Sequence, residues 1–312
     1  MQPQIVCLGE PMLELNSQVD GRYLAGHGGD TSNCAIAAAR QGASVGYFTR
    51  LGGDAFGDSF IDLWSAEGVD ASQVQRDPEA HTAVYFVDHG EGGHRFTYLR
   101  SGSAASRMTP QSVPRDYIAG ARVLHVSGIS QAISQSACDA VFEAIAVARA
   151  GGVTVSYDTN LRLKLWPLVR ARAITHAAMR DCDIALPGLD DAVHLTGQTD
   201  PDAIADFYLA LGPATVALTL GKAGTLVATP QRRERIAARE VAAVDATAAG
   251  DTFDGAFLAE LLRCGDPFAA ARHANAAAAL STLGYGAVAP MPSRAAVLAF
   301  LAGESGKPEG GG

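Results

Sequence analysis

The chain has 312 residues, 48% of them hydrophobic, and its 24 basic and 33 acidic residues give a formal charge of −9. This length and apolar fraction suffice for one large α/β domain or two small ones. The sequence has neither a run rich in Lys and Arg nor an apolar run as long as a membrane span, which argues against nucleic acid and membrane as partners.

The five cysteines are scattered along the chain and form no Cys-x-x-Cys pair. An odd number of isolated cysteines is typical of buried thiols in a reducing compartment. The N-terminus also lacks the basic and apolar blocks of a signal peptide. We therefore expect a cytoplasmic protein.

The first predicted strand, residues 5–9, is apolar and ends in a glycine turn. Glu10 follows it directly, at the carboxyl end of a strand, where α/β proteins bind ligands. Two interpretations of Glu10 are equally open. Its carboxylate either accepts a hydrogen bond from a ligand hydroxyl or is a solvated acid in a turn.

Residues 26–33 lead into an Ala-rich helix that continues to Arg40. Gly29 and its neighbouring glycine allow a ligand to lie against the backbone, while Asp30 and Asn33 lie in the first helical turn. There, the two polar side chains can reach ligand hydroxyls. The alternative is a capped helix after a flexible loop.

Residues 82–87 and 95–99 are short β-rich runs that flank a polar loop and predict a hairpin. Tyr98 and Arg100 would share one face of its second strand. A guanidinium can bind a carboxylate through two hydrogen bonds, so the pair suits a polyol that carries a carboxylate. The alternative is an exposed strand edge with a solvated arginine.

From residue 123 onward, predicted strands and helices alternate, which is typical of a doubly wound parallel sheet. The strand at residues 153–157 ends at Asp158, and Arg162 follows four positions later. One interpretation is a salt bridge between the two, which does not exclude a ligand near Arg162. A later strand, residues 215–219, leads into a glycine turn that lacks the spacing of a P-loop.

Residues 245–257 are the most informative stretch of the chain for function. A β-like run at residues 241–244 leads into it, and an amphipathic helix follows. The small residues Ala248, Ala249 and Gly250 therefore lie at a helix start, where backbone N–H groups lack partners and the helix dipole is positive. A phosphate can approach such N–H groups closely.

Asp251 stands beside this expected anion site. A carboxylate next to a phosphate repels it, so a carboxylate kept at this position suggests a chemical role. We expect a general base that takes the proton from a substrate hydroxyl as its oxygen attacks the terminal phosphorus of ATP. The simpler alternative is an Asp that caps a helix after a turn of small residues.

These motifs resemble those of the ribokinase-like (PfkB) carbohydrate kinases over roughly residues 4 to 300. Residues 245–251 are similar to the family's second signature, Asp-Thr-x-Gly-Ala-Gly-Asp, although Ala248 stands where most members have Gly. Residues 28–33 match the Gly-Gly-x-x-x-Asn sugar-binding element. Residues 98–104 resemble the Tyr-x-Arg-x-Gly-Ser-Ala element of one branch, the 2-keto-3-deoxygluconate kinases.

The resemblance implies an α/β fold, the ribokinase-like three-layer α/β/α sandwich, as one domain over residues 1–303. Strands from about residues 11–25 and 81–100 would form a small β-sheet lid over the sugar, as in the family. Residues 304–312 would form a disordered tail. A homo-oligomer is expected, because the exposed strand edges of such a lid need covering.

The resemblance also implies ATP with Mg²⁺ and leaves open a monovalent cation. Asp191 replaces the usual Glu of an Asn-x-x-Glu motif, with Gly188 in place of the Asn, and would hold Mg²⁺ through water. The residues implied to bind the nucleotide are Thr219, Gly221, Gly224, Ala249, Gly250 and Asn275.

The implied acceptor is 2-keto-3-deoxy-D-gluconate, phosphorylated to its 6-phosphate. Asp251 would be the base, and the amides of Ala248, Ala249 and Gly250 would stabilise the transferring phosphoryl group. The alternatives are a family kinase for 2-keto-3-deoxygalactonate, fructose or ribose, and a catalytically silent sugar- or nucleotide-binding protein. The residues implied to bind the sugar are Glu10, Gly29, Asn33, Tyr98, Arg100, Ile129, Arg162 and Asp251.

Overall fold

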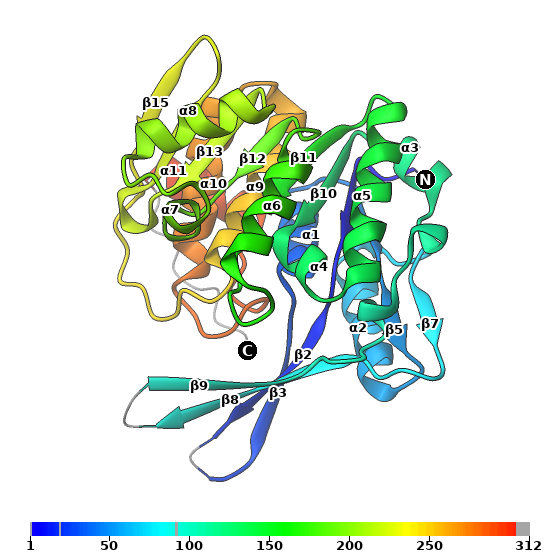
Figure 1. The fold of residues 1–312 in the computed structure, drawn as a ribbon. Helices are drawn as coiled ribbons and strands as arrows, with labels where there is room; N and C mark the ends of the chain where they lie inside the picture. Colours follow the sequence, from blue (N-terminus) through cyan, green and yellow to red (C-terminus); the bar gives the residue numbers. More distant parts are fainter. Residues whose placement is uncertain (1, 19, 91–92, 304–312) are drawn as a thin grey trace.

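The computed structural model describes residues 2–18, 20–90 and 93–303, and its centre is a nine-stranded sheet with helices on both faces (Figure 1). All neighbouring strands pair in parallel except β13 with β14 and β14 with β15. The predicted α/β sandwich is thus confirmed. In pairing order, the strands are β15 (Arg233–Ile236), β14 (Thr225–Ala228), β13 (Thr215–Thr219), β12 (Ile184–Leu186), β11 (Thr154–Asp158), β10 (Val123–Ser127), β1 (Ile5–Leu8), β4 (Val45–Phe48) and β6 (Val69–Asp70).

Alternation of side chains along the strands divides the core into two apolar layers. In β1, Ile5 and Cys7 belong to one layer, and Val6 and Leu8 to the other. The helices of the first layer are α1 (Asp30–Arg40), α2 (Ala55–Ala66), α9 (Ala249–Cys264), α10 (Pro267–Ser281) and α11 (Arg294–Leu301). Those of the second are α3 (Arg115–Ala119), α5 (Gln135–Ala150), α6 (Leu168–Met179), α7 (Leu189–Thr196) and α8 (Pro201–Leu211).

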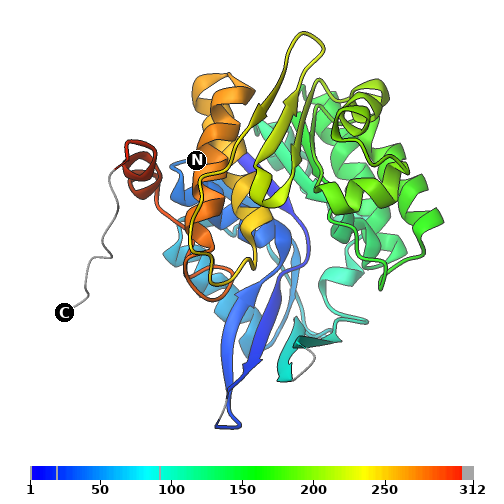
Figure 2. The same ribbon diagram turned by 90° about the vertical axis from the view of Figure 1, so that its left-hand side faces the viewer.

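A four-stranded sheet, here called the small sheet, extends from one end of the sandwich, as two views show (Figures 1 and 2). Its second and third strands pair in parallel, and the outer pairs are antiparallel. The segment expected at residues 11–25 is longer than predicted, because its second strand continues to Gly28. In pairing order, the strands are β3 (Tyr23–Gly28), β2 (Met12–Ser17), β8 (Ala83–Gly90) and β9 (Gly93–Leu99).

The prediction of a strand at residues 241–244 is wrong. This segment is a loop, because the backbone N–H groups of Val244 and Asp245 donate to the carbonyl of Thr282 at the end of α10 (2.7 and 3.2 Å) instead of to a neighbouring strand. The expected tail at residues 304–312 lies outside the described residues. The remaining elements are α4 (Gly128–Ala132), the two-stranded sheet of β5 (Arg50–Gly52) and β7 (Gln75–Asp77), and the 3-10 turns η1 (Ala105–Arg107), η2 (Pro110–Ser112) and η3 (Gly221–Ala223).

None of the helices in the described ranges combines the length and the apolar character needed to cross a membrane.

Candidate active site

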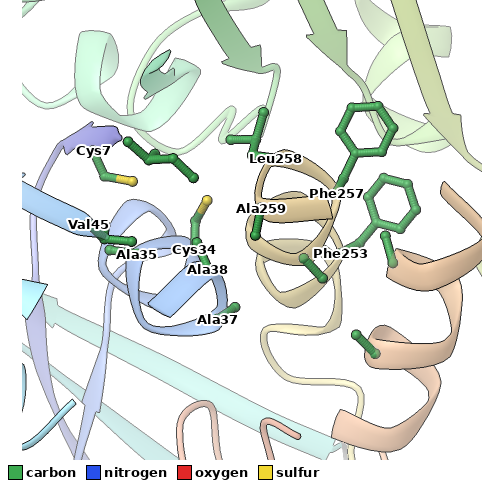
Figure 3. Packing of buried hydrophobic residues seen from close by; sticks show 14 of the residues in the cluster. Cys7, Cys34, Ala35, Ala37, Ala38, Val45, Phe253, Phe257, Leu258 and Ala259 are labelled. Carbon is green, nitrogen blue, oxygen red and sulfur yellow. The ribbon is translucent and has the colours of Figure 1, made fainter. Parts of the chain in front are cut away.

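Two neighbouring helices, α1 and α9, bring their first turns together. Gly255 permits the close approach, because a Cβ at this position would lie 2.3 Å from the carbonyl oxygen of Cys34. Figure 3 shows the small side chains of α1, such as Ala38, beside the apolar residues of α9. As a result, Nδ2 of Asn33 donates a hydrogen bond of 2.8 Å to Oδ2 of Asp251. A residue expected to bind the sugar therefore contacts the expected base.

Asp251 lines a cavity of about 510 Å³ whose walls come from both the sandwich and the small sheet. The sequence reasoning missed Tyr85, Phe96, Asn160 and Lys164 in its wall. Tyr85 could have been found as the cross-strand partner of Tyr98, had the register of β8 and β9 been known. The eight residues predicted to bind the sugar all line this cavity: Glu10, Gly29, Asn33, Tyr98, Arg100, Ile129, Arg162 and Asp251.

Asp30 brings a second carboxylate into the same cavity. Its Oδ2 accepts a hydrogen bond of 3.1 Å from Nδ2 of Asn160. Its Oδ1 and Oδ1 of Asn33 are buried, and no group of the described chain donates to them. Buried acceptors without a partner are costly, so these two oxygens are suited to receive hydroxyl groups of a ligand.

The charge state of Asp251 is set by this environment. Burial and the carboxylate of Asp30 raise the pKa of Asp251 to about 7, although Asn33 and Arg162 act in the opposite direction. Burial and neighbouring carboxylates likewise raise the pKa of Asp254, one helical turn further on. A carboxylate whose pKa lies near neutrality is well suited to accept a proton.

Glu10 is buried, so its interpretation as a solvated turn acid is wrong. Nη2 of Arg100 donates to one carboxylate oxygen, and Oγ of Ser103 donates to the other at 2.5 Å. Burial raises the pKa of Glu10, and the nearby guanidinium of Arg100 opposes this shift. Arg100 lies one residue beyond β9, so it does not share a strand face with Tyr98 as predicted, although its guanidinium lies 5.9 Å from the centre of that ring.

The salt bridge between Asp158 and Arg162, one of the two interpretations of this strand end, is not formed. Nη1 of Arg162 donates to the carbonyl of Leu161 at 2.9 Å, and Oδ1 of Asp158 accepts from the N–H of Asn160 at 3.1 Å. Within residues 2–18, 20–90 and 93–303, no carboxylate forms an ion pair with Arg162 or Lys164. Both cations, which are exposed, are therefore available to an anionic ligand.

A second cavity, of about 550 Å³, also borders the start of α9. Ala249 and Gly250 line this second cavity, whereas Ala248 and Asp251 line the first. The helix start thus lies between the two cavities, which is the arrangement needed to pass a group from one ligand to another. The six residues predicted to bind the nucleotide all line the second cavity: Thr219, Gly221, Gly224, Ala249, Gly250 and Asn275.

The amide of Asn275 is already used within the protein. Its Oδ1 accepts from Oγ1 of Thr225 at 2.7 Å, and its Nδ2 donates to the carbonyl of Ile236 at 3.0 Å. Asn275 therefore shapes the wall of the cavity by holding these two segments together. The sequence reasoning missed Lys222 and Phe253 in the same wall.

Ala248 caps α9 in the left-handed conformation, with φ 58° and ψ 16°. This conformation costs a residue with a Cβ about 1–2 kcal/mol. We predict that Ala248→Gly raises the free energy of unfolding by about 0.5–1 kcal/mol, because relief of this strain outweighs the greater flexibility of glycine in the unfolded chain. Urea denaturation measures the effect. Ala249→Gly, one residue inside the helix, is the matched control and should lower stability; equal effects would contradict the strain argument.

Asp191 lies outside the walls of both cavities. Its Oδ2 accepts a hydrogen bond of 2.8 Å from the N–H of Leu161. The described part of the chain places no group of three or more His, Cys, Asp or Glu side chains where they could hold a metal ion. The residues present therefore do not fit a Mg²⁺ site made by protein side chains.

Comparison with known proteins gives consistent matches. The family model described as pfkB family carbohydrate kinase matches residues 2–294. The chain is similar to the 2-dehydro-3-deoxygluconokinase of Thermoproteus tenax, with 37% identity covering 88% of this chain and 87% of that protein. It is also similar to the protein of the same name from Bacillus subtilis (strain 168), with 32% identity covering 90% and 88%.

A similar solved structure is that of fructokinase from Vibrio cholerae O395 in its fructose, ADP and calcium ion bound form. It superposes with a TM-score of 0.87 at 30% sequence identity, covering 96% of this chain and all of that one. The ribokinase-like fold expected from the sequence is confirmed by this similarity.

Proposed function

Because the chain belongs to the pfkB family of carbohydrate kinases, and is thus an ATP-dependent sugar kinase, we propose that its acceptor is 2-keto-3-deoxy-D-gluconate. The product would be the 6-phosphate. The observation that carries this proposal is the presence of three cations, Arg100, Arg162 and Lys164, in the cavity that also contains Asp251. A neutral sugar has no use for such a cluster, whereas a sugar acid has a carboxylate to place there.

In the proposed reaction, the sugar acid occupies the cavity beside Asp251 and ATP occupies the cavity on the other side of the α9 start. Asp251 accepts the proton of the 6-hydroxyl as its oxygen forms a bond to the terminal phosphorus. The bond from that phosphorus to the bridging oxygen breaks, and ADP leaves. The N–H group of Gly250 stabilises charge on the phosphoryl group in transit, whereas the N–H of Ala249 already donates to the carbonyl of Ala246 at 3.2 Å.

The partners of the reaction are also part of the proposal. ATP brings Mg²⁺ held by its own phosphates and water, and the small sheet closes over the sugar as a lid that excludes water. The monovalent cation stays a prediction. We further propose that the protein is cytoplasmic and that it forms a homo-oligomer. The oligomer is proposed because the edge strands of the small sheet expose Leu24 (64%) and Leu99 (54%), which association of two chains would cover.

Fructose is the second candidate acceptor. The charge of Arg100 is balanced by Glu10 within the protein, which reduces the electrostatic attraction for an acid at that end of the cavity. A similar structure also contains fructose.

A coupled assay for ADP with MgATP decides between the two candidates. The panel comprises ketodeoxygluconate, ketodeoxygalactonate, fructose, ribose and no sugar. Turnover selective for ketodeoxygluconate supports the proposal. Turnover on neutral sugars alone would overturn the role of the three cations and leave Asp251 in place.

The pKa of Asp251 predicts the pH dependence. Only the ionised carboxylate can accept the proton, so kcat/KM should fall about tenfold for each pH unit below about 7 and level off above it. Asp30→Asn removes the neighbouring negative charge and should move the acid limb to lower pH. The measurement is a pH–rate profile of both proteins. If the acid limb of the pH–rate profile lies at the same pH in the variant as in the wild type, burial alone sets the pKa of Asp251.

A further inference from the structure

The loop after β11, residues 159–167, brings Arg162 and Lys164 into the acceptor cavity, and α7 holds this loop in two ways. Oδ2 of Asp191 accepts from the N–H of Leu161 at 2.8 Å. One turn further along α7, Leu195 belongs to the same buried apolar cluster as the side chain of Leu161. A polar and an apolar contact from one helix therefore fix the residue that precedes Arg162.

The backbone on the N-terminal side of Arg162 is fixed at a second point. Asn160 has a φ of 25°, in the left-handed region, and its side chain donates to Asp30. Nη1 of Arg162 also donates to the carbonyl of Leu161. The course of the chain and the direction of the guanidinium are thus both tied to Leu161, whose N–H is bonded to Asp191.

Three observations separate Asp191 from the nucleotide. The residue does not line the cavity that contains the predicted nucleotide-binding residues. One of its oxygens is used by Leu161, and the position expected to supply a neighbouring amide is Gly188.

We infer that Asp191 is a positioning residue that fixes Arg162 in the acceptor cavity, and that it is not a ligand of Mg²⁺, either directly or through water. The inference rests on the proposed function in one respect, namely that Arg162 contacts the acceptor or the phosphoryl group. It changes the role that the family resemblance implies for this position.

Two substitutions separate the two roles. Asp191→Asn removes the charge but keeps an oxygen that can accept from the N–H of Leu161, whereas Asp191→Ala removes both. Asp190→Asn is the matched control, because Asp190 is exposed on the same helical turn. For each variant, KM is measured for the acceptor and for MgATP, the Mg²⁺ concentration for half-maximal rate is determined, and MgADP binding is measured by calorimetry.

A positioning role predicts that Asp191→Ala raises KM for the acceptor roughly tenfold, because a displaced binding group loses its geometry. MgATP and MgADP affinities should stay within about twofold in all variants, and Asp191→Asn should restore the acceptor KM to within about twofold of the wild type. The double variant Asp191→Ala/Arg162→Ala should be no worse than Arg162→Ala alone, because the first residue acts through the second.

The inference is overturned if Asp191→Asn raises the Mg²⁺ requirement or weakens MgADP binding, or if Asp191→Ala leaves the acceptor KM unchanged. If Asp191→Ala does not fold, the neutral Asn variant still decides, since a metal ligand would lose affinity with its charge. Failure of the proposed acceptor is recognised separately, in the wild-type sugar panel, and the variants are then measured with the sugar that the wild type phosphorylates.

Discussion

Asp251→Asn is expected to lower kcat by a factor of about 10²–10⁴ and to leave the binding of MgATP intact. The substitution keeps the shape of the side chain and can still bond to Asn33, which donates to Oδ2 of Asp251 in the wild type. It removes only the ability to take up a proton. Turnover measured with ADP detection and nucleotide binding measured by calorimetry together test the assignment, and near-normal turnover would refute it.

A stability measurement excludes misfolding as the cause of such a loss. The pKa of Asp251 rises from 3.8 to about 7 on folding, so its ionised form lowers the stability of the folded chain at any pH above about 4. The penalty is complete above about pH 7 and disappears below about pH 4. Asp251→Asn should therefore melt at a higher temperature than the wild type at pH 8, with the difference shrinking as the pH falls. An inactive but more stable variant would show that the buried carboxylate of Asp251 lowers the stability of the fold and is kept for its role in the reaction.

Contiguous motifs explain why so much of the site could be predicted from the sequence. In residues 28–33 and 245–251, the side chains that matter lie within one turn between elements, so local geometry fixes their relative positions once the element is recognised. The alternation of apolar runs predicted the doubly wound sheet for a similar reason, since strands buried on both faces are apolar throughout.

Contacts between distant segments could not be predicted in this way. Glu10 bonds to Arg100 across 90 positions of sequence, and no local pattern indicates that the carboxylate is buried. The bond from Asp191 to the N–H of Leu161 depends on the packing of α7 against a loop. The apolar run at residues 241–244 suggested a strand, but its polar backbone groups bond to the end of α10 because α10 lies beside it.

The buried pair of Glu10 and Arg100 leads to the second large effect. Arg100→Ala is expected to raise KM for ketodeoxygluconate by more than about tenfold and to destabilise the fold at neutral pH by about 3–5 kcal/mol. The stability loss arises because Glu10, which is 1% exposed, would keep a buried charge without its partner. Thermal or urea unfolding and steady-state kinetics with ketodeoxygluconate measure the two parts.

The double variant Glu10→Gln/Arg100→Ala separates the effect of losing Arg100 on sugar binding from its effect on the stability of the fold. It leaves no unpaired charge, so it should recover most of the lost stability while KM for the sugar acid stays high. Without Arg100, the pKa of Glu10, which burial already raises, should rise further. An acid whose pKa is raised in the folded state destabilises it at high pH and ceases to do so as it becomes protonated. The stability gap between Arg100→Ala and the wild type should therefore narrow from pH 8 to pH 5. A double variant as unstable as the single one would show that Arg100 acts through packing instead of charge.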